Sequence, residues 1–219
     1  MATRAEKKAR TRNALIDSVL SIVGYGANFA SISLREVAKT AGVVPTSFYR
    51  HFGDMEELGL TMVDELGLNL RRLMRGSFDA TAALDDMIDQ CVEAYQRYVI
   101  ENANLLQFMN QSRTGGTPAL QDAIRNELRF VSSRIATELA QVYPHMQAPD
   151  REIAATLIVS LLLENTTELL AVAEGNDALL RESLERTKGQ MRLIMAGAQH
   201  WRDRAATKKT ASKTVRKKK

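Results

Sequence analysis

Only four prolines interrupt the 219-residue chain, and between them apolar residues recur every three or four positions. This spacing places the apolar residues on one face of an α-helix, and no stretch of useful length alternates apolar with polar residues as a half-buried β-strand does. We therefore expect an all-α fold. The predicted helices, bounded by glycine, asparagine and proline, are residues 4–23, 34–41, 45–51, 54–74, 82–101, 105–111, 118–143, 149–173 and 177–202.

Charge is distributed unevenly along the chain. The net charge is +4, but residues 1–53 carry eight Lys or Arg against three acids, and residues 208–219 carry seven Lys or Arg and no acid. The segment 54–207 between them is therefore acidic. A basic head and a basic tail predict contact with a polyanion such as double-stranded DNA. For the tail, a solvated and disordered lysine run is an equally good interpretation.

The single cysteine, Cys91, excludes a disulfide within the chain and a cysteine-rich zinc site. The first twelve residues are basic and polar with no apolar run behind them, which is unlike a signal peptide. The most apolar stretch, residues 153–163, is too short to span a bilayer and is expected to be a buried helix. These features predict a cytoplasmic protein with no membrane partner.

Residues 33–52 have the pattern of two short helices joined by a tight turn. Ser33 and Glu36 form a capping box at the start of the first helix, and Gly42 breaks that helix. Pro45 suits the first position of the next helix, where its missing N–H is not needed. Within that helix Phe48 and Phe52 lie four residues apart and face a core.

The opposite side of this second short helix carries Thr46, Ser47 and Arg50, with Tyr49 and His51 at its flanks. Hydroxyl groups and a guanidinium on a short helix can reach base edges and phosphates in the major groove. Each hydroxyl could instead serve only the helix start, and His51 could simply be solvated.

Residues 33–52, SLREVAKTAGVVPTSFYRHF, resemble the TetR family of bacterial repressors in spacing, turn and aromatic positions. The resemblance implies a homodimer on a palindromic operator, each subunit with a three-helix head (residues 1–53), a six-helix regulatory and dimerisation body (54–204) and here a basic tail (205–219). The DNA-binding residues that it implies are Arg35, Pro45, Thr46, Ser47, Tyr49, Arg50 and His51. Pro45 stands where the family often has lysine.

Residues 44–75, VPTSFYRHFGDMEELGLTMVDELGLNLRRLMR, and Arg113 in SRTGG look like the family branch that represses unsaturated fatty acid synthesis and desaturation. That resemblance implies a long-chain acyl-coenzyme A effector. The body is rich in Met and Leu and poor in aromatics, a composition that can line a flexible apolar pocket. The candidate ligand-binding residues are Met62, Met87, Cys91, Phe108, Met109, Arg113, Phe130, Leu161 and Leu162. Each apolar one of them taken alone could equally be ordinary core.

Phosphates of the coenzyme A headgroup could bind Arg71, Arg72, Arg75 or Arg113, although a solvated helix face is the simpler interpretation of each. The last two predicted helices have more apolar surface than one face needs, which a second subunit could bury. The candidate dimer-interface residues are Leu157, Leu184, Met191, Ile194 and Met195.

Catalysis has little support. The sequence contains no G-x-S-x-G, P-loop or H-E-x-x-H motif, and the histidines at 51, 145 and 200 lack metal-ligand spacing. We therefore expect no catalytic residue, no metal and no cofactor. The leading hypothesis is a ligand-gated repressor of fatty-acid synthesis or desaturation genes. A constitutive DNA-organising protein that depends on the lysine tail is the alternative, and a small helical enzyme is a distant third.

Overall fold

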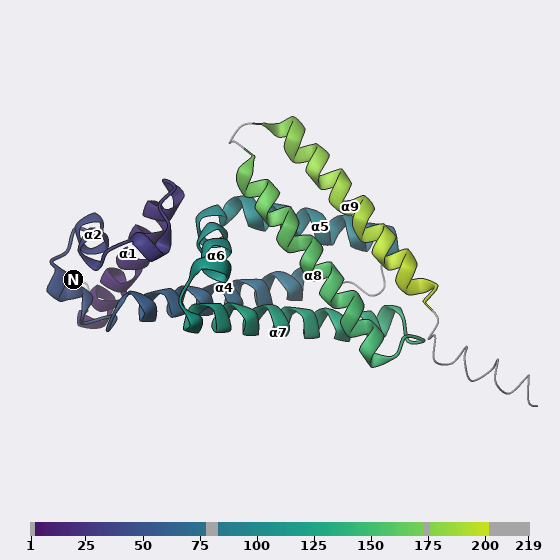
Figure 1. Ribbon diagram of the computed structural model, residues 1–219, viewed down its shortest axis with the longest axis horizontal. Coiled ribbons are helices and arrows are strands. Elements are labelled where there is room, and N and C mark those ends of the chain that lie inside the picture. The colour runs from purple at the N-terminus through teal and green to yellow at the C-terminus, as the bar shows by residue number, and fades with distance from the viewer. Residues whose placement is uncertain (1–2, 78–82, 173–175, 202–219) are drawn as a thin grey trace, which may run out of the picture.

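A computed structural model describes residues 3–77, 83–172 and 176–201, and within these ranges the chain forms helices and no strand (Figure 1). This confirms the all-α prediction. The elements are α1 (Arg4–Gly24), the 3₁₀ turn η1 (Phe29–Ser31), α2 (Leu34–Thr40), α3 (Pro45–Phe48), α4 (Met55–Ser77), α5 (Leu84–Glu101), α6 (Ala103–Gly115), α7 (Pro118–Val142), α8 (Ala148–Ala171) and α9 (Asp177–Gln199).

Two elements differ from the sequence prediction. α3 is a single α-helical turn and is shorter than the predicted helix 45–51. Tyr49 is its C-cap, and the residues that follow form hydrogen-bonded turns, with Arg50 N–H donating to Ser47 O at 3.2 Å. α6 is longer than predicted: it begins directly after Asn102, which forms only a brief break behind α5. The predicted tail, residues 205–219, lies outside the described residues.

Side chains fix the helix starts that orient the head. Ser33 Oγ accepts from Glu36 N–H at 3.2 Å, which is the first half of the predicted capping box. Asp54 Oδ1 accepts from Glu57 N–H at 2.8 Å, and the Glu57 carboxylate accepts from Gly53 N–H at 2.6 Å. At the turn between α2 and α3, Gly42 has φ = 67°, a left-handed conformation that a side chain would strain.

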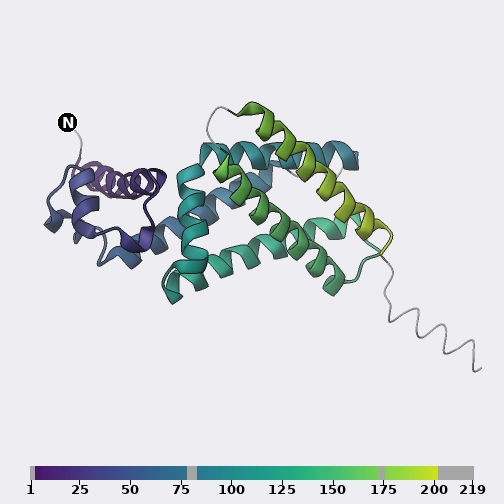
Figure 2. The same cartoon turned by 45° about the horizontal axis from the view of Figure 1, so that its top comes forward.

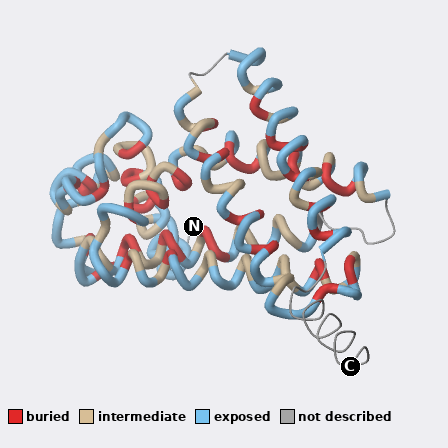
Figure 3. The backbone as a smooth tube through the Cα atoms, turned by 45° about the vertical axis from the view of Figure 1, so that its right-hand side comes forward, coloured by how far each residue is buried: buried red, intermediate tan, exposed pale blue. Residues whose placement is uncertain are grey.

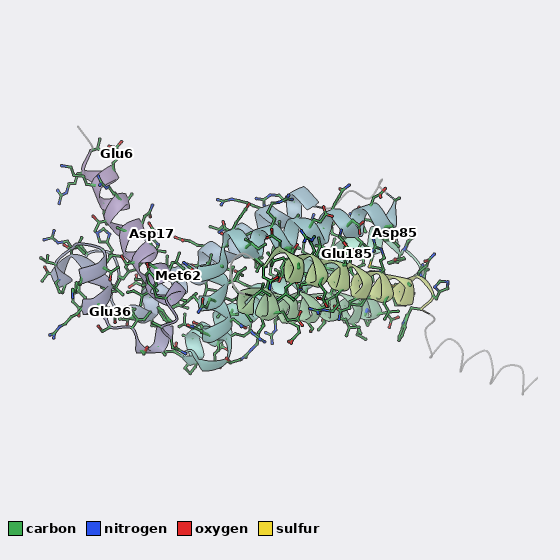
Figure 4. The ribbon with its side chains drawn as sticks, turned by 90° about the horizontal axis from the view of Figure 1, so that it is seen from above. Glu6, Asp17, Glu36, Met62, Asp85 and Glu185 are labelled. Atoms are coloured by element: carbon green, nitrogen blue, oxygen red, sulfur yellow. The ribbon has the colours of Figure 1, made fainter. Side chains whose placement is uncertain are left out.

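The three-helix head has a small core of Leu15, Val19, Val37, Phe48 and Phe52, all essentially inaccessible to solvent. This core does not end at residue 53. It continues through Leu58, Met62 and Leu66 of α4 into Phe108 of α6 and Leu120 of α7. In Figure 4, Met62 lies where the head meets the body, well away from Asp85 and Glu185. Head and body therefore share one packed core.

The body is a layered set of long helices (Figures 1 and 2). α4 and α7 run side by side, joined by the ion pair of Arg71 with Glu127 at 2.6 Å. α5, α8 and α9 form a second core with α7. Lys188 of α9 forms an ion pair with Glu93 of α5 at 2.7 Å. That carboxylate is the main cause that raises the pKa of Lys188.

α8 is less buried than predicted. By length and composition it is the one helix among the described residues that could cross a membrane, with a mean hydropathy of 1.5 over 18 residues, which is weak evidence on its own. Only 33% of that window is buried inside the subunit. Figure 3 shows exposed residues interspersed with buried ones along the body helices. α8 packs on α7 and α9 with one side, and its exposed side carries the apolar Ile153 and Leu157 among polar residues such as Glu152, Thr156 and Ser160.

Candidate DNA-binding face and body cavity

The turn from α2 into α3 presents a polar face. Phe48 and Phe52 point into the head core, with ring centroids 5.6 Å apart. Arg35, Pro45, Thr46, Tyr49 and Arg50 are exposed, Tyr49 to 64%, and Ser47 and His51 are half-buried. All seven predicted residues are therefore at or near the surface of the head, and their contact with DNA stays a prediction.

His51 is the most unusual residue of this face. Its Nδ1 is shielded from solvent and has no hydrogen-bond partner among the described residues. Burial lowers the pKa of His51, and the positive charges of Lys8, Arg12 and Arg50 lower this pKa further.

Lys8 and Arg12 of α1 thus lie close enough to the turn to act on His51 electrostatically. Arg12 also places its guanidinium 5.3 Å from the ring centroid of Phe52 and 3.5 Å from the Glu65 carboxylate. Lys8 and Arg12 contribute to the positive charge of the head, but neither was among the DNA-binding residues predicted from the sequence. Their i, i+4 spacing on one helix face was the available indication.

A helix-turn-helix with a polar, cationic outer face is the geometry with which such motifs enter the major groove of DNA, and here it is set on a body that is helical in its described residues. Residues 27–61 match the family model of the bacterial regulatory proteins of the tetR family. This segment spans η1, α2, α3 and the start of α4, so the helix-turn-helix region of the head is similar to that of this family.

Solved structures share the fold over most of the chain. The fatty acid degradation regulator FadR of Bacillus halodurans is 15% identical with a TM-score of 0.67, covering 83% of this chain and 96% of that one. A transcriptional regulator of Pseudomonas aeruginosa PAO1 is 18% identical with a TM-score of 0.68, covering 87% and 93%. A TetR-family regulator of Mesorhizobium loti is 17% identical with a TM-score of 0.65, covering 89% and 98%.

The body contains an apolar cavity of about 170 Å³ between α4, α5, α7, α8 and α9. Four methionines, whose thioether chains adapt easily to different shapes, contribute to its wall. The lining residues are Leu73, Met74, Met87, Ile88, Cys91, Val92, Tyr95, Ile135, Glu138, Leu139, Ile158, Leu162, Met191 and Met195.

Three lining residues carry polar groups. Tyr95 Oη donates a hydrogen bond to Leu162 O of α8 at 2.6 Å and also contacts the Thr166 hydroxyl. Burial raises the pKa of Tyr95. Burial likewise raises the pKa of the Cys91 thiol. Glu138 forms an ion pair with Arg134, one turn earlier on α7. Among the described residues no cluster of three His, Cys, Asp or Glu could hold a metal ion.

The structure brings together only part of the predicted ligand set. Met87, Cys91 and Leu162 line the cavity. Met62, Phe108 and Met109 belong instead to the shared head–body core, and Leu161 packs on the body core without reaching the cavity. Phe130 is exposed, with Arg71 5.2 Å from its ring centroid, and Arg113 is exposed at the end of α6. These six residues therefore do not line this cavity, because helix periodicity identifies buried faces without telling which core they join; ligand binding by any of the nine stays a prediction.

The predicted dimer residues also separate. Leu157 is exposed on α8, and Leu184 and Ile194 are half-buried against the body core. Met191 and Met195 are buried in the cavity wall and not on the subunit surface, and a dimer interface at the five predicted residues stays a prediction. Tyr95 lines the cavity but was not among the ligand-binding residues predicted from the sequence. Met87, Cys91 and Tyr95 follow one another at four-residue intervals on one face of α5, and this spacing could have identified Tyr95.

Proposed function

We propose that the protein is a dimeric, ligand-responsive transcriptional repressor that binds a palindromic operator in the cytoplasm. The observation that carries this proposal is that one helix, α4, serves both parts of the molecule. Leu73 and Met74 of α4 line the body cavity, and Leu58 and Met62 of the same helix pack in the head core. A molecule that displaces the far end of α4 would therefore disturb the packing of the head.

Such a displacement regulates DNA binding only if the ligand prefers one arrangement of the head over the other. A second, indirect route runs through α6, which contacts α5 and α8 without lining the cavity and whose Phe108 ring meets the Phe29 ring edge-on at 4.8 Å. Both routes end at residues adjoining the helix-turn-helix. They support coupling between the cavity and the DNA-binding face.

Dimerisation is supported by apolar residues that the subunit leaves exposed. These residues lie on α8 and α9: Ile153, Leu157, Leu179 and Leu193. An apolar surface on two adjacent helices favours burial against a second copy, and a two-fold dimer matches a palindromic operator. We therefore place the dimer interface on the outer faces of α8 and α9.

We propose a long-chain acyl-coenzyme A thioester as the effector and fatty-acid synthesis or desaturation genes as the targets. The wall of the cavity is apolar, and each buried methylene contributes about 0.8 kcal/mol. A solved structure of similar fold is a regulator of fatty acid degradation in its own organism. A cavity of about 170 Å³ is below the roughly 300–1,000 Å³ of typical ligand sites, so the methionines must move to admit a long chain.

The coenzyme A phosphates would remain outside the cavity. Arg72 and Arg75 are exposed on α4, the helix that brings Leu73 and Met74 to the cavity, and we propose them as the phosphate contacts. Arg71 is engaged by Glu127.

The test is operator binding, measured by gel shift with palmitoyl- and oleoyl-coenzyme A at matched free concentrations. We expect both thioesters to change operator affinity and to differ from each other, because a cis double bond alters the packing that the cavity must adopt. Identical curves for both thioesters and for no ligand would contradict the acyl-sensor function but not the proposal that the head binds DNA.

The alternative, a DNA-organising protein, rests on the lysine-rich residues 208–219. Deleting these residues should lower nonspecific affinity and flatten its salt dependence, because fewer counterions are released, while preference for the operator survives. Loss of that preference on truncation, or no preference in the full chain, would favour the organiser instead.

A further inference from the structure

Building on the proposed ligand-sensing function, we infer that Glu138 makes the cavity select against free carboxylates, so that the effector presents an uncharged or cationic group to the cavity. The residue lies on α7 and is 9% exposed, and apart from Cys91 and Tyr95 the other described lining residues are apolar. No lysine or arginine is among the described lining residues. A fatty acid and its thioester share the same chain, and the charge at Glu138 would distinguish them.

The ion pair with Arg134 does not cancel this charge on the cavity side. The side chain of Arg134 is 48% exposed, whereas that of Glu138 is 12% exposed. Water and salt screen the field of an exposed guanidinium, while a carboxylate at an apolar wall is screened much less. A ligand in the cavity therefore experiences a net negative group.

The remaining polar groups offer little compensation to an incoming anion. The Tyr95 hydroxyl already donates to Leu162 O, and a thiol such as that of Cys91 is only a weak donor. A carboxylate entering the cavity would lose its hydration without gaining a strong donor and would also meet the charge of Glu138. A neutral ester or thioester avoids both costs, and an ammonium group would be attracted.

The experiment measures binding of three ligands with the same twelve-carbon chain, dodecanoate, dodecanol and dodecylammonium, to the full-length protein by calorimetry below their micelle concentrations. The wild type should bind dodecanoate at least about tenfold more weakly than dodecanol, as expected for like charges at intermediate dielectric. Glu138→Gln should strengthen dodecanoate binding by a similar factor, weaken dodecylammonium binding and leave dodecanol unchanged. Glu101→Gln, which removes an exposed carboxylate at the end of α5, should change none of the three.

The wild-type measurements test the inference even if Glu138→Gln does not fold. Equal affinity of the wild type for dodecanoate and dodecanol overturns it, and so does an unchanged preference in Glu138→Gln. Dodecanoyl-coenzyme A is titrated in parallel. If neither the thioester nor any of the three ligands binds, both the proposed ligand sensor and this inference fail, whereas equal binding of all ligands overturns the inference alone.

Discussion

Gln111 of α6 holds the backbone of Phe29 in the head, since its side-chain Oε1 accepts a hydrogen bond from Phe29 N–H at 3.1 Å. The same amide uses its Nε2 to donate to Ala27 O at 3.2 Å. One side chain of the body thus satisfies two backbone groups in the loop between α1 and α2. This loop precedes the helix-turn-helix directly, so any movement of α6 reaches the DNA-binding face through these bonds.

We predict that Gln111→Leu lowers the free energy of unfolding by about 1–3 kcal/mol, because two part-buried backbone groups lose their partners. It should also reduce the effect of an acyl thioester on operator affinity several-fold, while thioester affinity itself stays near wild type. Urea unfolding and gel shifts with and without ligand measure the two effects. Gln107→Leu, one turn earlier on α6, is the control, and equal behaviour of both variants would contradict a coupling role for Gln111.

The DNA-binding face is tested by Arg50→Ala, which should weaken operator binding by about 1–3 kcal/mol if Arg50 reads a base, at unchanged stability. Tyr49→Phe should weaken binding less, because it removes a single hydroxyl contact. Tyr25→Phe, at the 91% exposed C-cap of α1, serves as the matched control. Wild-type operator affinity of Arg50→Ala in gel shifts would place the face elsewhere.

His51 predicts a pH dependence with a definite sign. Its pKa in the folded protein is lowered from the ordinary value of 6.5, so the unfolded chain binds the proton more readily. Stability should therefore fall as the pH drops below about 6.5. Phosphates of bound DNA would offset Lys8, Arg12 and Arg50 and raise this pKa, so operator binding should take up a proton and tighten as the pH falls towards the pKa of His51. His51→Gln should remove this tightening at constant salt, and an equal slope in both proteins would rule out His51 as its source.

Leu193→Glu tests the dimer interface more cleanly than a change at a half-buried position, because Leu193 is 76% exposed in the subunit. A carboxylate there should leave the fold intact and shift the protein to monomer, since it would be buried without a partner. Sedimentation velocity measures the shift. Leu68→Glu, at an exposed position of α4, is the control, and an unchanged dimer in Leu193→Glu would move the interface to another face.

Substitutions at two neighbouring leucines of α8 test whether the ligand binds in the cavity. Leu162 lines the cavity and Leu161 does not. Leu162→Trp should fill the cavity and reduce dodecanoyl-coenzyme A affinity by tenfold or more, with a cost of about 1–3 kcal/mol in stability from overpacking. Leu161→Trp should have a comparable stability cost but retain ligand binding. Equal ligand affinity of the two variants would show that the ligand binds outside the cavity.

The local order along this chain follows from its sequence. Helical spacing of apolar residues, few prolines and caps such as Ser33 and Asp54 fix where helices begin and end, because these effects act within one or two turns. The helix-turn-helix is equally local: Gly42, Pro45 and the pair Phe48 and Phe52 suffice to orient α3, so its outward residues could be predicted.

Only the tertiary structure decides which helix faces meet. Met62, Met87 and Met191 look alike in sequence, yet Met62 joins the head–body core while the other two wall the cavity. The cavity is lined by residues of α4, α5, α7, α8 and α9, and nothing in the sequence marks Glu138, the one carboxylate among its described lining residues, before α7 packs between α4 and α8. Periodicity determines that a face is buried, but the burial partner depends on long-range packing, which no local pattern encodes.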